Sequence, residues 1–292
     1  LLVEQKIFQG GGAVANLKKE ELSIEIAKYD FKKIEQEILL KAVDAHFNYI
    51  LTKKTVNINK ENVDLLERQV ETDKIRLEKG DINLTDLAQS EASLSGARAK
   101  LILANNQLVN AKANFLKIVG EKPNQNIKDF ENFKVNLPES LAKANQLAKT
   151  NNPDLQSAAL ELKKSEQEIK IAKSDLSPSA TLSYKIAQQD DLSTTIEERT
   201  QQTLKATASW PLFSGGKNIA ALNKSKEIRN KKSLLLEDVE KQVETTLLNS
   251  WSNLQSLKSL LNSVRLQVKA AEIANEGITQ EYESGQNRTT LE

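Results

Sequence analysis

Apolar residues recur every seven positions along a stretch of the chain, Ala13 to Lys79, that contains neither Gly nor Pro. They form two offset stripes, and charged residues lie on the remaining faces. One stripe is Ile24, Phe31, Ile38 and Ala45, and the other is Ala42, Tyr49, Val56, Val63, Val70 and Leu77. A seven-residue repeat keeps an apolar seam turned toward neighbouring helices, as in coiled coils. The pattern therefore predicts one helical rod, roughly 100 Å long at about 1.5 Å per residue.

A second helical pattern follows after Gly80 and runs from Thr85 to Val119. Its apolar residues also lie seven apart, at Leu87, Leu94, Leu101, Leu108 and Phe115. We predict that Thr85 or Asp86 caps this helix and that Gln89 completes a capping box. The two helices are expected to form an antiparallel hairpin, followed by an irregular connector over residues 120–137.

The rest of the chain changes period twice. Residues 139–175 have a helical pattern, interrupted where Asn152 can cap a new helix with Pro153 in its first turn. Residues 180–186 and 204–212 alternate apolar and polar side chains, which predicts two half-buried strands joined by a polar loop over 188–202. A last long helix is predicted over 218–284.

The two halves of the chain align without a gap when 205 is added to the residue number. Phe8, Gly10, Gly11 and Gly80 then fall on Phe213, Gly215, Gly216 and Gly285, respectively. We predict an internal duplication with a first repeat over 1–137 (strand, long helix, return helix, connector). The second repeat covers 138–292 (helices, two strands, long helix). The expected fold class is mainly α with a minor β part, built of long antiparallel coiled-coil hairpins.

Composition excludes several kinds of function. The 292 residues include 41 basic and 40 acidic side chains. Because these charges nearly balance, we expect no nucleic-acid partner. The chain has one His and no Cys. No residue set matches a catalytic, metal or cofactor site, and the protein is not expected to be an enzyme. The longest apolar runs are far shorter than the roughly 20 residues that a membrane-spanning helix needs.

Three signatures in this order resemble the TolC family of outer-membrane export ducts. The first is Trp210-Pro211-Leu212-Phe213-Ser214-Gly215-Gly216 and its counterpart Ile7-Phe8-Gln9-Gly10-Gly11-Gly12. The second is Asn152-Pro153-Asp154-Leu155 before a helix rich in Ala and Lys that runs to Pro178. The third is the pair of hairpin tips around Gly80 and Gly285.

The resemblance implies a homotrimer in the outer-membrane lipid, with four strands per subunit in a shared twelve-stranded β-barrel and helical hairpins forming a periplasmic tunnel. The implied function is that of a passive exit duct of a tripartite efflux or type I secretion system. Its implied partners are a periplasmic adaptor and an inner-membrane pump, either ABC or proton-driven. The cargo, protein or small molecule, stays open. The chain contains no Met, and we expect it to be an internal segment without the family's first strand, first helix and final helix.

The resemblance also suggests roles for single residues. Asp86, Tyr282, Arg288 and Glu292 match a periplasmic gate, although the spacing before Glu292 is one residue longer than that before Asp86. For Asp86 the alternative is a helix cap, and for Glu292 it is an ordinary solvated acid. The tips with Gly80, Ile82, Leu84 and Gly285 match adaptor contacts, or else are plain turns. Gly10, Gly11, Gly215 and Gly216 match strand–helix junctions. Trp210 and Tyr184 are candidates for the membrane interface, with packing beneath the barrel as the alternative.

Two other functions are compatible with parts of the pattern. A periplasmic adaptor (membrane fusion) protein also has a long hairpin, but normally one hairpin between compact β domains. A soluble coiled-coil scaffold would leave the two alternating stretches at 180–186 and 204–212 unexplained. We therefore favour the channel.

Overall fold

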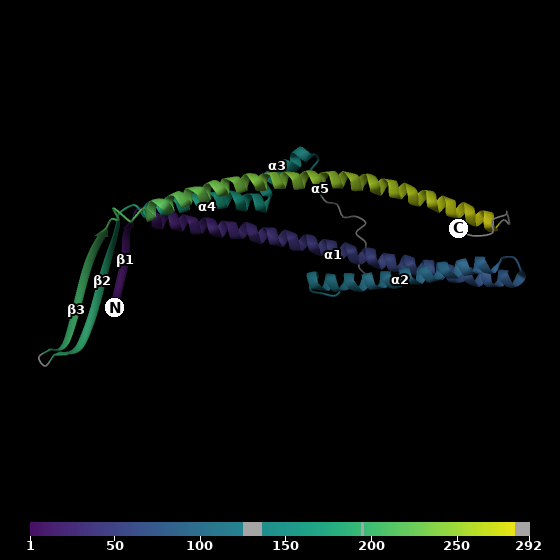
Figure 1. Ribbon diagram of the computed structural model, residues 1–292, viewed down its shortest axis with the longest axis horizontal. Coiled ribbons are helices and arrows are strands. Elements are labelled where there is room, and N and C mark those ends of the chain that lie inside the picture. The colour runs from purple at the N-terminus through teal and green to yellow at the C-terminus, as the bar shows by residue number, and fades with distance from the viewer. Residues whose placement is uncertain (125–135, 194–195, 284–292) are drawn as a thin grey trace. The chain divides into compact units, whose positions relative to one another are not determined.

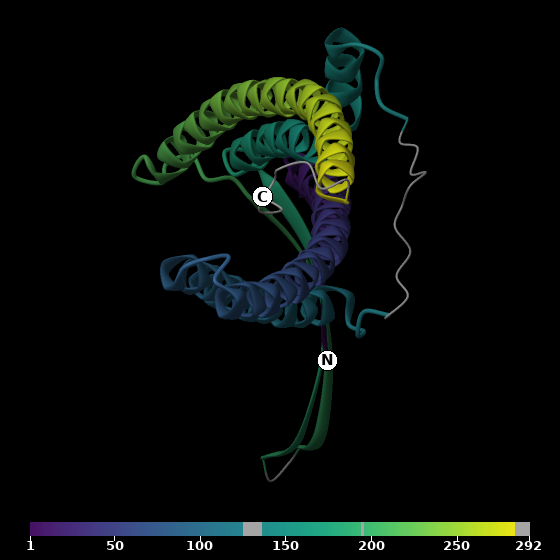
Figure 2. The same cartoon turned by 90° about the vertical axis from the view of Figure 1, so that its right-hand side faces the viewer.

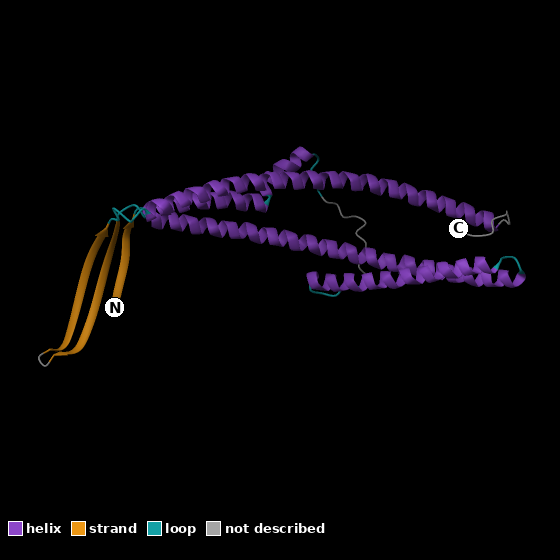
Figure 3. Cartoon of the chain, viewed as in Figure 1, coloured by secondary structure: helices purple, strands orange, loops and turns teal. Residues whose placement is uncertain are grey.

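The computed structural model describes residues 1–124, 136–193 and 196–283, with side chains described except at 190–198, 279 and 281–283. Two long helices dominate it, accompanied by three shorter helices and a small sheet (Figures 1 and 3). In chain order the elements are β1 (Leu2–Gln9), α1 (Gly12–Lys79), α2 (Leu84–Val119), α3 (Leu141–Asn151), α4 (Pro153–Ser174), β2 (Ser179–Ser193), β3 (Ile196–Ser209) and α5 (Lys217–Glu283). The mainly α fold with a minor β part is confirmed. The chain divides into two compact units, residues 1–30 with 137–292 and residues 31–136.

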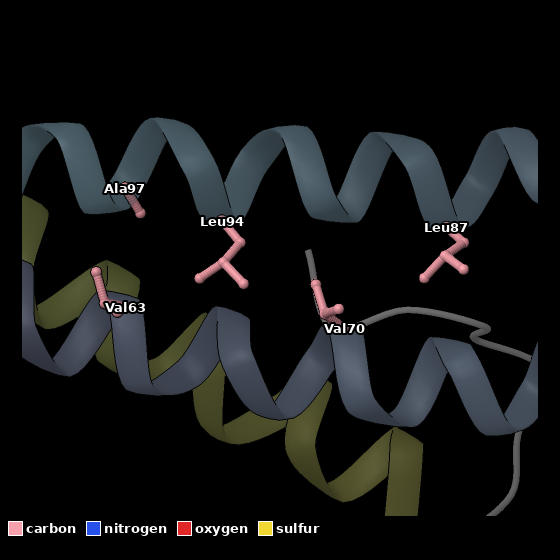
Figure 4. Close-up of a cluster of buried hydrophobic side chains, with 5 residues drawn as sticks. All are labelled: Val63, Val70, Leu87, Leu94 and Ala97. Carbon is pink, nitrogen blue, oxygen red and sulfur yellow. The ribbon is translucent and has the colours of Figure 1, made fainter.

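Within unit 31–136, α1 and α2 form the predicted antiparallel coiled-coil hairpin. Its core is Val63, Val70, Leu87, Leu94 and Ala97 (Figure 4). Large and small residues alternate along the buried face of α2, where Ser90, Ala97, Ala104 and Ala111 lie between the leucines. Small side chains on one helix let the backbone of the other approach closely, so a narrow seam closes without voids.

Among the residues that the structure describes, neighbours bury much of the second predicted stripe of α1 but leave most of the first exposed. Tyr49, Val63 and Val70 of the second stripe are buried. In the first stripe, the side chains of Ile24, Phe31 and Ile38 are at least half exposed. Ala45, which ends the first stripe, is buried at 2% exposure. Since a helix presents more than one face, a seven-residue repeat fixes the seams but not which neighbour covers each of them.

The start of α2 differs from the prediction. Asn83 is the N-cap and Asp86 occupies the third helical position, so the capping box is Asn83–Asp86 and the predicted caps Thr85 and Asp86 with Gln89 are wrong. An Asn side chain caps a helix at least as well as Thr, and Asn83 lies nearer to the glycine turn. α2 therefore begins at Leu84, directly after Asn83, the first capping residue that follows the glycine turn.

The sheet is antiparallel with strand order β1-β2-β3. β1 pairs with β2 from Leu2↔Lys185 to Gln9↔Ser179, and β2 pairs with β3 from Ser179↔Ser209 to Ser193↔Ile196. The predicted polar loop 188–202 is wrong, because most of it belongs to the two strands. Ladder hydrogen bonds use backbone groups, so a ribbon can continue through polar residues once its register is set. The second predicted strand ends at Ser209 rather than at Leu212, just before Trp210-Pro211.

The long helix α5 packs against α4, which lies alongside its first part (Figures 1 and 2). The break between α3 and α4 is as predicted: the Asn152 side chain accepts the Leu155 N–H, and Pro153 stands in the first turn. Ion pairs join the two helices from Glu161 to Lys232 at 3.0 Å and from Glu166 to Arg229 at 3.9 Å. No described helix combines the length and the apolar character needed to cross a membrane.

Positions related by the 205-residue shift have the same backbone conformation at the start of the long helices. Gly10 and Gly215 have φ values of 55° and 61°, and Gly11 and Gly216 both have 82°. The first helical hydrogen bonds also correspond, from Ala15 N–H to Gly11 O and from Ala220 N–H to Gly216 O. The agreement supports the duplication, and the repeat boundaries 1–137 and 138–292 stay a prediction.

Candidate functional site

Four of the predicted tip and gate residues lie together at the turn between α1 and α2. Gly80, Ile82 and Leu84 belong to this turn and the first residue of α2, and Asp86 follows in the first turn of the helix. Tyr282 lies in the last turn of α5, and its side chain is outside the described residues. Gly285, Arg288 and Glu292 also lie outside the described residues. The structure therefore gives the geometry of the first tip only.

The turn after α1 has hydrogen bonds that satisfy the last carbonyls of the helix. Gly80 has a φ of 83°, in the left-handed region that glycine tolerates best. Its N–H donates to Leu77 O at 3.0 Å, and the Asp81 N–H donates to Arg76 O at 2.9 Å. This pair of bonds is a Schellman motif, which ends the helix sharply and fixes the direction of the chain beyond it.

The opposite side of the turn is held by the capping box of α2. The Asp86 N–H donates to Asn83 Oδ1 at 3.0 Å, and the Asn83 N–H donates to Asp86 Oδ2 at 3.1 Å. Asp86 is exposed, and no other hydrogen bond to its carboxylate is found within the described chain. The carboxylate thus caps the helix and still has acceptor sites free for a further donor. The Asp86 carboxylate can therefore take part in the helix cap and in the predicted gate at the same time.

The tip presents one prominent apolar side chain. Leu84 is 71% exposed, whereas Ile82 is half-buried. Lys79 and Asp81 beside them are exposed. The exposed apolar side chain of this tip is therefore Leu84, which lies near the charged side chains of Lys79 and Asp81 in the sequence.

A buried polar pair that the sequence analysis missed lies just behind the tip. Ser90 of α2 donates to Asp73 Oδ2 of α1 at 2.6 Å, and both residues are less than a tenth exposed. Asp73 lies three residues after Val70 and four before Leu77, which is a seam position. A polar residue inside a seam was the signal that could have revealed the pair. Such pairs fix the register of coiled coils at some cost in stability.

The two strand–helix junctions meet the segment that ends α4. A Cβ atom built on Gly10 would overlap the Ser177 side chain, whereas Gly215 has open space around it. The Trp210 Nε1–H donates to Leu176 O at 3.2 Å, and Asn218 Nδ2 donates to Asp175 O at 2.9 Å. Residues 174–177 therefore connect the start of α1 to the end of β3 and the start of α5.

Trp210 and Tyr184 differ in their surroundings. Trp210 is 62% exposed although its indole N–H is bonded, and the Tyr184 hydroxyl donates to Gln202 Oε1 at 3.0 Å across the β2–β3 ladder. The place of these two residues at the membrane interface stays a prediction.

Several ionisable groups in the described part of the chain form ion pairs, and one of these pairs joins α4 to α5. Burial raises the pKa of Glu161, but its hydrogen bond and charge interaction with Lys232, and those with Lys164, outweigh this and leave the pKa below its usual value. No group of three or more His, Asp or Glu residues that could hold a metal ion occurs among the described residues. The arrangement serves to hold helices together.

Comparisons with known proteins agree with this geometry. The family model for the outer membrane efflux protein matches residues 1–121 and 144–290. A curated relative, the outer membrane efflux protein BepC of Brucella suis biovar 1 (strain 1330), is 24% identical over 291 residues. The match covers 99% of this chain and 63% of BepC, so the chain spans less than two thirds of that relative's length.

Solved structures share the fold at low identity. A membrane protein from Pseudomonas aeruginosa has a TM-score of 0.82 at 15% identity, with 98% of this chain and 66% of that chain covered. CusC, whose crystal structures describe conformational changes accompanying folding and transmembrane channel formation, has a TM-score of 0.84 at 16% identity, with 98% of this chain and 67% of that chain covered. These structures extend beyond the part that this chain matches.

Proposed function

Because the chain belongs to the outer membrane efflux protein family, we propose that it forms the main part of the outer-membrane channel of a tripartite efflux or type I secretion system. In this function it is a passive conduit and not an enzyme, and its helices lie in the periplasm. The single observation that supports this most is the combination of a family match over nearly the whole chain with a strand–glycine–long-helix order that occurs twice. The family match favours the channel over an adaptor or a coiled-coil scaffold.

We infer a closed trimer from the unpaired strand edges and the exposed apolar stripe of a single chain. β1 and β3 are the two edges of the sheet, and their outer backbone groups have no strand partner in the described part of the chain. In lipid such unpaired groups cost several kcal/mol each, roughly, so strands must pair with other strands until the sheet closes. The uncovered apolar stripe of α1 requires a neighbour for the same physical reason. Three copies around a hollow axis satisfy both needs, as in the resemblance to TolC.

We propose the capped turn at Gly80–Leu84 as a contact for a periplasmic adaptor, with Leu84 as its apolar anchor. The turn is hydrogen-bonded on both sides, so little conformational entropy is lost when a partner binds it. The second tip at Gly285 is proposed to act alike. An inner-membrane pump, ABC or proton-driven, would supply the energy.

The periplasmic gate is proposed to join Asp86 to Arg288 and Tyr282 of neighbouring helices, with Glu292 facing the pore. Asp86 supports this proposal because it is exposed and retains acceptor capacity beyond its cap bond. A ring of three carboxylates from three subunits would also favour cations at the entrance.

The test is to purify the full-length protein in detergent, measure its mass, and record conductance in a planar lipid bilayer. A trimer mass with discrete, cation-favouring conductance steps supports the proposal. A monomer that stays dissolved without detergent, or a trimer that gives no conductance under any voltage, contradicts it.

A further inference from the structure

A basic cleft lies at the junction between β1 and α1. It has a volume of about 490 Å³ and is lined by Lys18 from the second turn of α1 and by Lys170 and Lys173 from the last two turns of α4. Gly10 and Gly11 form its edge toward the sheet. All of these elements belong to the unit made of residues 1–30 and 137–292. We call it the junction cleft.

The junction cleft is lined by three lysines and by no acidic residue among those that the structure describes. None of the three lysines forms an ion pair in the described part of the chain. Lys170 Nζ donates to the neutral Gln167 Oε1 at 3.2 Å. Neighbouring lysines differ in this respect, since Lys19 pairs with Glu20 at 2.9 Å and Lys164 pairs with Glu161 at 3.6 Å. Three ammonium groups around one cleft repel one another, and an anion between them would relieve the repulsion.

Exposed apolar and aromatic side chains mark both strand–helix junctions. Phe8 precedes the glycines at the junction that holds the cleft, and it is 51% exposed. Trp210, Leu212 and Phe213 follow β3 at the other junction, and Phe213 is 90% exposed. Trp and other aromatic residues gather where lipid tails meet headgroups, and lysines next to them lie at headgroup depth. The occupant must therefore offer an anion at a lipid surface.

We propose that the junction cleft binds the phosphate of an anionic phospholipid in the periplasmic leaflet, with Lys18, Lys170 and Lys173 as the ligands. Lysine ammonium groups bind phosphate as point charges and do not need the planar fit of arginine. The proposal rests on the proposed outer-membrane location. In the second repeat the position of Lys18 is taken by Asn223, so one cleft per chain is expected.

Free phosphate carries the same kind of charged group as a phospholipid headgroup, but the apolar residues around the cleft favour the binding of a lipid. Val14, which also lines the cleft, is exposed beside the lysines. An inorganic ion would gain nothing from this side chain or from Phe8, whereas an acyl chain would cover them.

The experiment is lipid binding to the detergent-purified full-length protein, followed by native mass spectrometry. Phosphatidylglycerol and phosphatidylcholine are titrated separately, and inorganic phosphate is added as a competitor. The variant Lys18→Gln/Lys170→Gln/Lys173→Gln is compared with Lys100→Gln/Lys112→Gln/Lys117→Gln, which removes three exposed charges from α2. We expect the first variant to lose affinity for phosphatidylglycerol by about fivefold per lysine. Its affinity for phosphatidylcholine should fall much less, because the choline cation of that lipid balances the charge of its phosphate. The control variant should match the wild type.

Three results would overturn the proposal: equal phosphatidylglycerol affinity of the wild type and the junction variant, an equal loss in the control variant, or displacement of the lipid by an equimolar amount of inorganic phosphate. Conductance is recorded for the same samples. A wild type that conducts without preferring phosphatidylglycerol refutes the lipid site alone. A wild type that prefers phosphatidylglycerol but does not conduct refutes the channel function alone.

Discussion

Single residues decide the conformation at the points where long elements begin and end. Gly10 and Gly215 occupy corresponding positions with nearly the same positive φ, but only Gly10 lies against another side chain, that of Ser177. Any L-residue in the left-handed region costs about 1–2 kcal/mol, so both sites disfavour substitution. At Gly10 a side chain would also overlap Ser177, which adds a steric cost to the backbone cost.

We expect Gly10→Ala to destabilise the start of α1 more than Gly215→Ala destabilises the start of α5. The second change should cost only the backbone term of about 1–2 kcal/mol, which corresponds to roughly 5- to 30-fold faster amide exchange. Hydrogen exchange of the first helical turns in the full-length protein measures both. Equal effects of the two substitutions would show that Ser177 yields without cost.

Asp86 can be tested for gating without removing its cap. In Asp86→Asn the side-chain oxygen can still accept the Asn83 N–H, while the negative charge is lost. Combined with Arg288→Gln, this change should raise single-channel conductance in a planar bilayer, because the proposed ion pairs across the pore are gone. Lys79→Gln/Asp81→Asn, at the same tip, is the control and should leave conductance unchanged. Unchanged conductance in the first variant contradicts the gate.

At the scale of elements, helix pairs are held by apolar seams and aligned by a few polar contacts. In the α1–α2 hairpin the buried Ser90–Asp73 hydrogen bond occupies a position where a leucine would otherwise continue the core. Removing one partner leaves the other buried and unsatisfied, whereas replacing both restores an apolar seam.

Ser90→Ala alone should therefore lower the free energy of local opening of the hairpin by about 1–3 kcal/mol. The double change Ser90→Ala/Asp73→Leu should cost clearly less than Ser90→Ala and the single change Asp73→Leu added together. Amide exchange around Leu87 and Val70 reports on both, and the exposed Ser93→Ala serves as control. Additive costs would mean that the two side chains act independently.

The α4–α5 pair should depend on pH through Glu161. Because the folded pKa of this carboxyl lies below its ordinary value of 4.5, its contribution to stability is complete above that value. It is lost as the pH falls through the folded pKa. Protection of α4 amides, corrected for intrinsic exchange, should fall in that acidic window. Glu161→Gln should be less protected at neutral pH and should lose this dependence. Glu237→Gln, whose ion pair with Lys241 lies within one exposed helix, should change little. A wild-type profile that is flat through this window would contradict the role of the ion pair.

For the whole molecule, the apolar surface that one chain leaves exposed supports the proposed trimer. The stripe with Phe31, 68% exposed, is too regular and too apolar to face water along its full length. Phe31→Glu should reduce the trimer fraction of the full-length protein in detergent, because a carboxylate would be buried at the contact between subunits. Gln36→Glu adds the same charge on the same helix and should keep the trimer. Native mass spectrometry or light scattering measures the fraction. If Phe31→Glu stays trimeric, the stripe is not a subunit contact.

The sequence was sufficient where the structure depends on local or periodic information. The seven-residue repeat predicted α1 and α2, the lack of Gly and Pro kept α1 unbroken, the paired glycines marked the starts of α1 and α5, and Asn152-Pro153 marked the start of α4. These helices end within a few residues of the predicted positions, since backbone helix bonds are local and a seam needs only periodicity. The polar ends of β2 and β3 were missed, because their pairing depends on the backbone of another strand and not on their own side chains.

Long-range contacts were decided by the tertiary structure alone. Which stripe of α1 meets α2, the Ser90–Asp73 bond, and the meeting of Gly10 with Ser177 all join residues far apart in the chain. The periodicity of a helix shows which of its faces are apolar. It does not show which element covers each face, because the hydrophobic effect is nondirectional. The family could therefore be predicted from the residues, whereas the cap at the tip could not, because Asn83 rather than Thr85 or Asp86 caps α2. The charged cleft at the junction became visible only when α1 and α4 were brought side by side.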